Sequence, residues 1–185
     1  MMGNQNPVGV FDSGVGGIGT LSALRRELPQ EDFLYFGDTL HAPYGTKPRE
    51  EVMACVTRVM AHLLSNHVKA VVIACNTVTS LALDDLRQQH PELPIIGVIE
   101  PTVRKVVQSR CPNVGIIATK ATIQSDVYAR LLHNLDPSIR TSSLACPAFV
   151  PLIEEGIIDN EIMDLTIRYY MDDFVREKGF NHLIL

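Results

Sequence analysis

Short apolar runs alternate with amphipathic stretches along most of this 185-residue chain. The apolar runs are rich in β-branched and aromatic residues, which predicts strands over residues 8–11, 33–36, 70–74, 95–98, 114–118, 141–144 and 182–185. Helical spacing predicts helices over residues 18–28, 48–66, 80–89, 101–109, 123–133 and 160–178. Repeated β-α units of this length predict an α/β protein with doubly wound parallel sheets.

The pattern has a soft boundary near residues 99–101, and the two halves look alike. We therefore expect two similar α/β lobes, residues 1–98 and residues 99–185, with a crevice between them. The last apolar run, His182 to Leu185, is followed by no turn and no polar tail. This predicts that the C-terminal part of the second lobe is missing.

Composition argues against several classes of protein. Hydrophobic residues make up 46% of the chain, enough for a core, and a net charge of −5 without a Lys/Arg block predicts no binding to nucleic acid or membrane surfaces. No apolar run reaches the roughly 18 residues of a spanning helix, and Met1 to Pro7 do not resemble a signal peptide. The four cysteines form no CxxC motif, so we expect free thiols and a cytoplasmic location.

Polar residues recur where the expected strands end, and in open α/β sheets ligands bind at this edge. These residues are Asp12 and Ser13, Asp38, Cys75 to Thr77, and Thr119 with Thr122. Most such residues simply cap the next helix, but cysteine is a poor cap. We therefore expect the Cys75 thiol to face a crevice rather than the core. The loop Ala42 to Gly45 is also longer than an average connection.

The glycine-rich turn before the first helix has two interpretations. Gly14, Gly16 and Gly19 match the dinucleotide motif G-x-G-x-x-G, and Asp38 stands where a ribose-binding acid would be expected. Asp12 precedes the motif, however, and its carboxylate would repel a pyrophosphate. Alternatively, the N–H groups at the helix N-terminus hold a substrate carboxylate.

Motifs distributed over nearly the whole chain resemble the cofactor-independent glutamate racemases. They are VGVFDSGVGG at 8–17, YFGDT at 35–39, PYGTK at 43–47, ACNT at 74–77, IGVIEP at 96–101, IATKAT at 117–122, CPAFVP at 146–151 and LIEEG at 152–156. Two places depart from the family pattern: Thr102, where glycine is frequent, and Leu40 to Ala42.

The resemblance implies interconversion of L- and D-glutamate without pyridoxal phosphate or any other cofactor, supplying D-glutamate for peptidoglycan. Cys75 would be the acid/base on one face of the substrate Cα, assisted by Asp12, and Glu154 would support the opposite face. On pattern alone, Glu154 and Glu155 are equivalent helix residues. The substrate-binding residues implied are Ser13, Pro43, Tyr44, Gly45, Asn76, Thr77, Thr119 and Thr122.

The family uses two cysteines, and the resemblance places the second one after residue 185. Cys55, Cys111 and Cys146 do not fit that role, so we expect these 185 residues alone to be inactive or weakly active. The six histidines show no metal-ligand spacing, and no metal site is expected.

Three alternatives remain open: an aspartate racemase of the same family, a nucleotide-binding module built on the turn Gly14 to Gly19, and a binding protein without catalysis. Glutamate is the expected partner, and a homodimer is left open.

Overall fold

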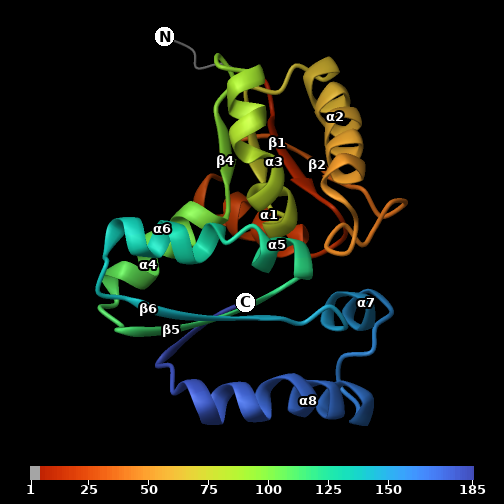
Figure 1. Ribbon diagram of the computed structural model, residues 1–185. Coiled ribbons are helices and arrows are strands. Elements are labelled where there is room, and N and C mark those ends of the chain that lie inside the picture. Colours follow the sequence, from red (N-terminus) through yellow and green to blue (C-terminus); the bar gives the residue numbers. More distant parts are fainter. Residues whose placement is uncertain (1–4) are drawn as a thin grey trace. The chain divides into compact units, whose positions relative to one another are not determined.

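The computed structural model describes residues 5–185 (Figure 1). Residues 1–4, part of the stretch inspected for a signal peptide, lie outside the described residues. The chain divides into two compact units, Met1–Val98 and Ile99–Leu185. Every strand pairing in the two sheets is parallel, so the predicted parallel α/β fold is confirmed.

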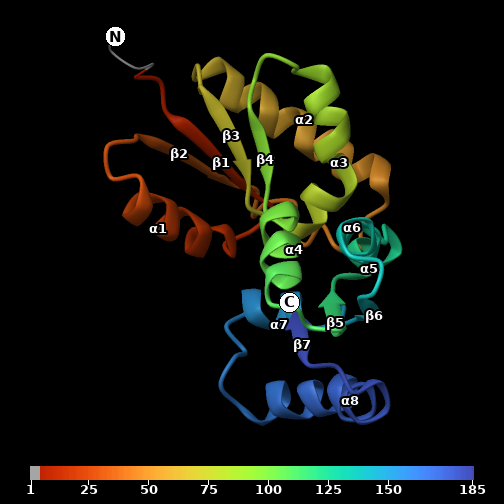
Figure 2. The same ribbon diagram turned by 90° about the vertical axis from the view of Figure 1, so that its left-hand side faces the viewer.

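The first unit holds a four-stranded sheet in the order β2-β1-β3-β4. Its elements are β1 (Val8–Asp12), α1 (Gly17–Glu27), β2 (Phe33–Gly37), α2 (Arg49–Ser65), β3 (Ala70–Ile73), α3 (Asn76–Gln89) and β4 (Ile95–Gly97). Figure 2 shows the four strands side by side, with α2 and α3 adjacent to each other and α1 apart from them. The first strand is therefore central, flanked by β2 and β3.

The core of the first unit lies between the sheet and the helices α2 and α3. Their apolar faces bury Leu63 and Val78 against strand residues such as Phe11 and Ile73. Helix α1 buries only Gly17. A Cβ at Gly17 would lie 2.7 Å from the Cβ of Asp12, so glycine permits the close approach of this helix to the end of β1.

The second unit holds a three-stranded sheet in the order β6-β5-β7. Its elements are α4 (Ile99–Gln108), β5 (Asn113–Ala118), α5 (Lys120–Gln124), α6 (Val127–Leu135), β6 (Arg140–Ala145), α7 (Phe149–Glu154), α8 (Glu161–Lys178) and β7 (His182–Ile184). Figure 1 shows α4 and α6 on one face of this sheet and α8 on the other. Side chains alternate accordingly: Val114 and Ile116 pack with α4 and α6, and Ile117 packs with Phe174 of α8.

Four helices differ clearly from the sequence prediction. The helix expected from residue 80 begins at Asn76, which makes Cys75 its N-cap residue. The helix expected over residues 123–133 is two helices, because Asp126 adopts a left-handed conformation with φ 54° between them. Helix α7 lies outside the predicted helix ranges; its Pro151 lies in the first turn, where proline is tolerated.

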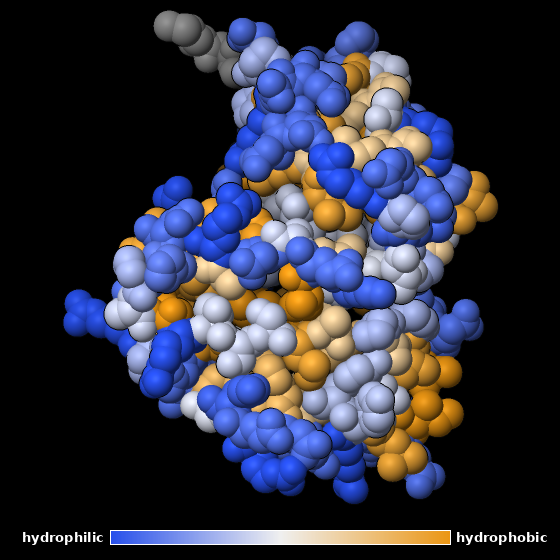
Figure 3. Space-filling model, in the orientation of Figure 1, coloured by the Kyte–Doolittle hydropathy of each residue, from blue (hydrophilic) through white to orange (hydrophobic). Residues whose placement is uncertain are grey.

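The surface carries an apolar patch but no membrane segment among the described residues. No helix in residues 5–185 is long and apolar enough to span a bilayer. Figure 3 shows hydrophobic side chains gathered over α7 and the start of α8. Ile153, Ile158, Ile162 and Leu165 are all about half exposed there.

Candidate active site

Asp12, Ser13 and Cys75 come together at the carboxyl edge of the first sheet. Strands β1 and β3 are neighbours, with Phe11 opposite Ile73, so the residues that follow the two strands meet. Ser13 Oγ lies 3.2 Å from Cys75 Sγ. The Asp12 carboxylate accepts a hydrogen bond from the N–H of Gly14 at 3.0 Å, which fixes it within the glycine turn.

The Cys75 thiol is held in its neutral form by its surroundings. Burial raises its pKa, and the negative charge of Asp12 raises it further. The Ser13 hydroxyl and backbone N–H groups of Val78 and Ser13 lower the pKa, but only in part. The net effect is a raised pKa, which favours the thiol over the thiolate despite the position at the N-terminus of α3. For Cys75 to remove a proton from a substrate, a nearby group must first accept the thiol proton, or a ligand must change the surroundings of the sulfur.

Cys75 was expected to face a crevice rather than the core, and in the structure its side chain is largely buried. Its side chain is 7% exposed and belongs to the same apolar cluster as Phe11, Tyr44 and Val78. Helix α3 starts directly after Cys75, which is its N-cap residue.

The other candidates of the first unit lie on two segments. Asn76 and Thr77 begin α3, where Asn76 is half-buried and Thr77 is 3% exposed. Tyr44 and Gly45 are buried in the loop before α2, and Pro43 is half-buried there. The structure therefore places Asp12, Ser13, Asn76 and Thr77 at the same sheet edge as Cys75.

Thr119, Thr122 and Glu154 belong to the second unit. Thr119 is the N-cap of α5: its hydroxyl accepts a hydrogen bond from the N–H of Thr122 at 3.3 Å. Thr122 is 2% exposed, with its hydroxyl 3.1 Å from that of Thr119. Glu154 is the last residue of α7 and is exposed.

Sequence reasoning missed Tyr35 as part of the site. Its hydroxyl donates a hydrogen bond to the carbonyl of Gly14 at 3.1 Å. Burial raises the pKa of Tyr35 to about 12, with contributions from the charges of Asp12 and Cys75. Tyr35 is thus a neutral hydroxyl beside the candidate acid/base, and only the register of β2 against β1 could have indicated it.

Asp38 is engaged by its own loop. Tyr44 donates a hydrogen bond to Asp38 Oδ2 at 2.5 Å, and His41 Nδ1 lies 2.7 Å from Asp38 Oδ1. Burial raises the pKa of Asp38, but these hydrogen bonds and the charges of His41 and Arg58 outweigh burial and hold the pKa below its usual value. A carboxylate that is 7% exposed and already has these partners is poorly placed to receive ribose hydroxyls.

The glycine turn also argues against a dinucleotide. The Gly14 N–H that would face a pyrophosphate donates to Asp12 instead. The carboxylate of Asp12 thus occupies the position of an anion at this helix end, and a phosphate there would meet a like charge.

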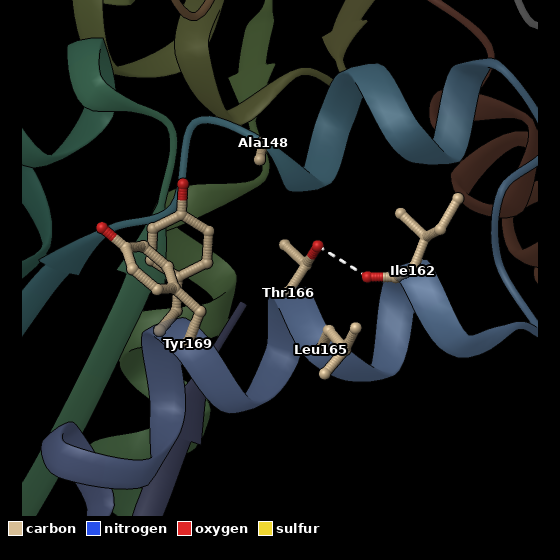
Figure 4. A pocket seen from close by; sticks show the side chains of 6 residues that line it. Ala148, Ile162, Leu165, Thr166 and Tyr169 are labelled. Carbon is tan, nitrogen blue, oxygen red and sulfur yellow. Dashed lines mark hydrogen bonds between the residues drawn. The ribbon is translucent and has the colours of Figure 1, made fainter.

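The second unit has a hollow between α7 and α8 (Figure 4). Ala148, Ile162, Leu165, Thr166, Tyr169 and Tyr170 line it. The Thr166 hydroxyl donates to the carbonyl of Ile162 at 2.7 Å within its own helix. None of the lining residues carries a charge, so this hollow offers no group to balance a charged substrate.

Comparison with known proteins gives consistent matches. The sequence profile described as Asp/Glu/Hydantoin racemase matches residues 19–185. A glutamate racemase from Geobacter metallireducens is 44% identical over 179 residues, which cover 96% of this chain and 66% of that protein.

Solved structures agree. The glutamate racemase of Francisella tularensis in complex with D-glutamate has a TM-score of 0.90 at 38% identity, covering 98% of this chain and 68% of that one. The aspartate racemase of Picrophilus torridus, at a TM-score of 0.65 and 16% identity over 98% of this chain and 80% of that one, shares the fold alone. The chain thus spans about two thirds of the length of its glutamate racemase relatives.

Proposed function

Because this chain belongs to the Asp/Glu/Hydantoin racemase family, we propose that it interconverts L- and D-glutamate, with Cys75 as the acid/base on one face of the substrate Cα. The observation that carries the proposal is the convergence of Asp12, Ser13 and Cys75 at one sheet edge. Glutamate is favoured over aspartate because the relatives with high identity are glutamate racemases. D-glutamate made in this way would serve peptidoglycan synthesis.

The proposed reaction removes the proton from one face of Cα and adds a proton to the opposite face. Cys75 first loses its thiol proton, for which Asp12 is the proposed acceptor or orienting group. The resulting thiolate takes the proton from Cα, and the electron pair left on Cα is delocalised into the substrate carboxylate. A second thiol then delivers a proton to the opposite face; the family resemblance implies this thiol, and the proposal applies to the protein that carries it.

The neutral state of Cys75 suits this sequence of events. In the reverse direction the same group must donate a proton to Cα, and a thiol with a raised pKa is protonated and ready to do so. We propose that Ser13, Asn76 and Thr77, with Pro43, Tyr44 and Gly45, hold the substrate. The family resemblance alone assigns Thr119 and Thr122 to substrate binding and Glu154 to support of the opposite face of Cα.

The test is exchange of the α-proton of glutamate in heavy water, together with loss of optical activity, using protein expressed from the complete gene. We expect both enantiomers to react, and Cys75→Ala to slow the exchange by about 10²–10⁴-fold. An unchanged rate in Cys75→Ala would overturn the role of Cys75. Faster turnover of aspartate than of glutamate would overturn the substrate.

A calorimetric titration with dinucleotides addresses the competing module. We expect no saturable binding, because Asp12 and Asp38 are engaged as described above. Tight binding that is lost when Gly16 is replaced by valine would favour the nucleotide module instead.

A further inference from the structure

The loop after β2 and the first turns of α2 bring three metal-ligand side chains together. Asp38 and His41 come from the loop, and Cys55 comes from α2. The carboxylate oxygen of Asp38, a ring nitrogen of His41 and the sulfur of Cys55 all lie within 4.8 Å of one another. Asp38 and Cys55 are 7% and 5% exposed, and His41 is half-buried. The cluster is thus buried on two sides and accessible through His41.

Neighbouring side chains hold two of these groups in place. Tyr44, which is 1% exposed, donates its hydroxyl hydrogen to Asp38 Oδ2 at 2.5 Å. Arg58 donates to Cys55 Sγ at 3.1 Å. Partners of this kind orient the ligands in metal sites, and a hydrogen bond to a coordinating carboxylate is typical of them. His41 needs no large movement, because its Nδ1 already lies 2.7 and 3.0 Å from the two oxygens of Asp38.

We propose that Asp38, His41 and Cys55 form a binding site for a divalent transition-metal ion of the zinc class. One sulfur, one imidazole nitrogen and one carboxylate oxygen are a ligand set that zinc accepts, with solvent as the fourth ligand. Tetrahedral ligands at about 2.0–2.3 Å from zinc lie roughly 3.3–3.8 Å apart. The three ligand atoms, all within 4.8 Å of one another, lie near that spacing.

The charges of the three ligands balance those of a divalent ion. Binding replaces the thiol proton of Cys55 by the metal and leaves His41 neutral, so the site supplies two negative charges against the two positive charges of the ion. The guanidinium of Arg58 donates to the sulfur at 3.1 Å and opposes the ion by its charge. Hard cations such as Mg²⁺ prefer oxygen ligands, so the sulfur and the imidazole select against them.

A bound ion would link the loop to α2. That loop includes Pro43, Tyr44 and Gly45, which the proposed function assigns to the substrate, but the metal site does not depend on that function. Because the ligands come together only in the folded chain, binding stabilises the folded state by mass action. Zinc is therefore expected to raise the thermal midpoint of the 185-residue chain.

The test uses the 185-residue chain, kept reduced and titrated with Zn²⁺ against a competing indicator, and with Co²⁺ as a spectroscopic probe. We expect saturable zinc binding, the intense visible bands of four-coordinate cobalt, and a thiolate-to-cobalt charge-transfer band. His41→Ala and Cys55→Ala should each weaken zinc binding at least tenfold. Because His41 is only half-buried, we expect His41→Ala to retain the fold even if Cys55→Ala does not.

The matched control is Cys111→Ala, which removes a second Cys–His contact, between Cys111 Sγ and His182 Nδ1 at 3.2 Å. This variant should bind zinc as the parent chain does and retain the cobalt charge-transfer band. The proposal is overturned if zinc does not bind saturably, if His41→Ala binds as tightly as the parent chain, or if Cys111→Ala alone loses binding.

Discussion

The hydroxyl of Ser13 lies 3.2 Å from the sulfur of Cys75, although 62 positions separate the two residues along the chain. The contact joins the turn after β1 to the first residue before α3, and it forms because β1 and β3 are adjacent parallel strands. Asp12, one residue earlier, acts on the same sulfur through its charge. The two neighbours shift the pKa of Cys75 in opposite directions, and each effect can be measured separately.

Asp12→Asn should lower the pKa of Cys75. The substitution removes the negative charge that disfavours the thiolate and leaves the burial of the sulfur unchanged. The measurement is a pH titration of thiolate ultraviolet absorbance, with Cys75→Ser subtracted as the blank. Glu27→Gln, which neutralises an exposed carboxylate at the end of α1, serves as control and should leave the pKa unchanged. A pKa that stays the same or rises in Asp12→Asn would contradict the assigned coupling.

Ser13→Ala should raise the pKa of Cys75 further, because the serine hydroxyl is one of the groups that favour the thiolate. Reaction of the thiol with a small alkylating reagent speeds up as pH rises through its pKa, so the midpoint of that profile should move to higher pH. Ser13→Thr retains the hydroxyl and should restore the parent profile. If alanine and threonine gave the same profile, the hydrogen bond would have no influence on Cys75.

Much of the fold follows from the alternation of apolar and amphipathic segments, because parallel β-α units leave few other arrangements for such a pattern. The surroundings of Cys75 were harder to predict. Its burial depends on where α3 begins, and the predicted start was four residues too late. Helix ends are set by local backbone geometry, which hydrophobic spacing does not encode.

The surroundings of Asp38 show a second reason why sequence alone did not predict the site. Residue types alone suggested a ribose-binding acid, whereas the structure engages Asp38 with Tyr44 and His41. Cys55 is a buried residue of α2, and its approach to His41 depends on the path of the loop between β2 and α2. Histidine spacing along the sequence cannot detect a cluster that combines a loop with a helix.

Gly17→Ala and Gly19→Ala should have opposite effects on stability. A Cβ at Gly17 would lie 2.7 Å from Asp12 Cβ and 3.0 Å from Ala74 Cβ, and such overpacking costs about 1–3 kcal/mol. A Cβ at Gly19 meets no atom within 4 Å, so alanine should stabilise α1 by roughly 0.5–1 kcal/mol.

Urea denaturation measures the free energy of unfolding of both glycine variants. Both positions lie within the motif that resembles a dinucleotide site. A difference in stability between the two variants without any ligand would show that packing alone requires glycine at position 17. Equal destabilisation by the two alanines would show that the close approach of α1 to Asp12 is not what requires glycine at position 17.

Thr119 has two candidate roles, and its substitutions can separate them. As the N-cap of α5 it accepts a hydrogen bond from the N–H of Thr122, so Thr119→Ala should destabilise the fold by about 0.5–2 kcal/mol. Asn and Asp are cap residues at least as good as Thr, so Thr119→Asn and Thr119→Asp should retain stability. Urea unfolding of the three variants checks the capping role.

Glutamate binding then decides whether Thr119 also contacts the substrate. Aspartate at position 119 preserves the cap but places a negative charge where the family resemblance puts a substrate carboxylate, whereas asparagine preserves the cap without the charge. We therefore expect Thr119→Asp to lose glutamate affinity, measured by calorimetry on the protein from the complete gene, and Thr119→Asn to retain most of it. If Thr119→Asp binds glutamate as tightly as Thr119→Asn does, Thr119 is a helix cap and should be removed from the proposed substrate site.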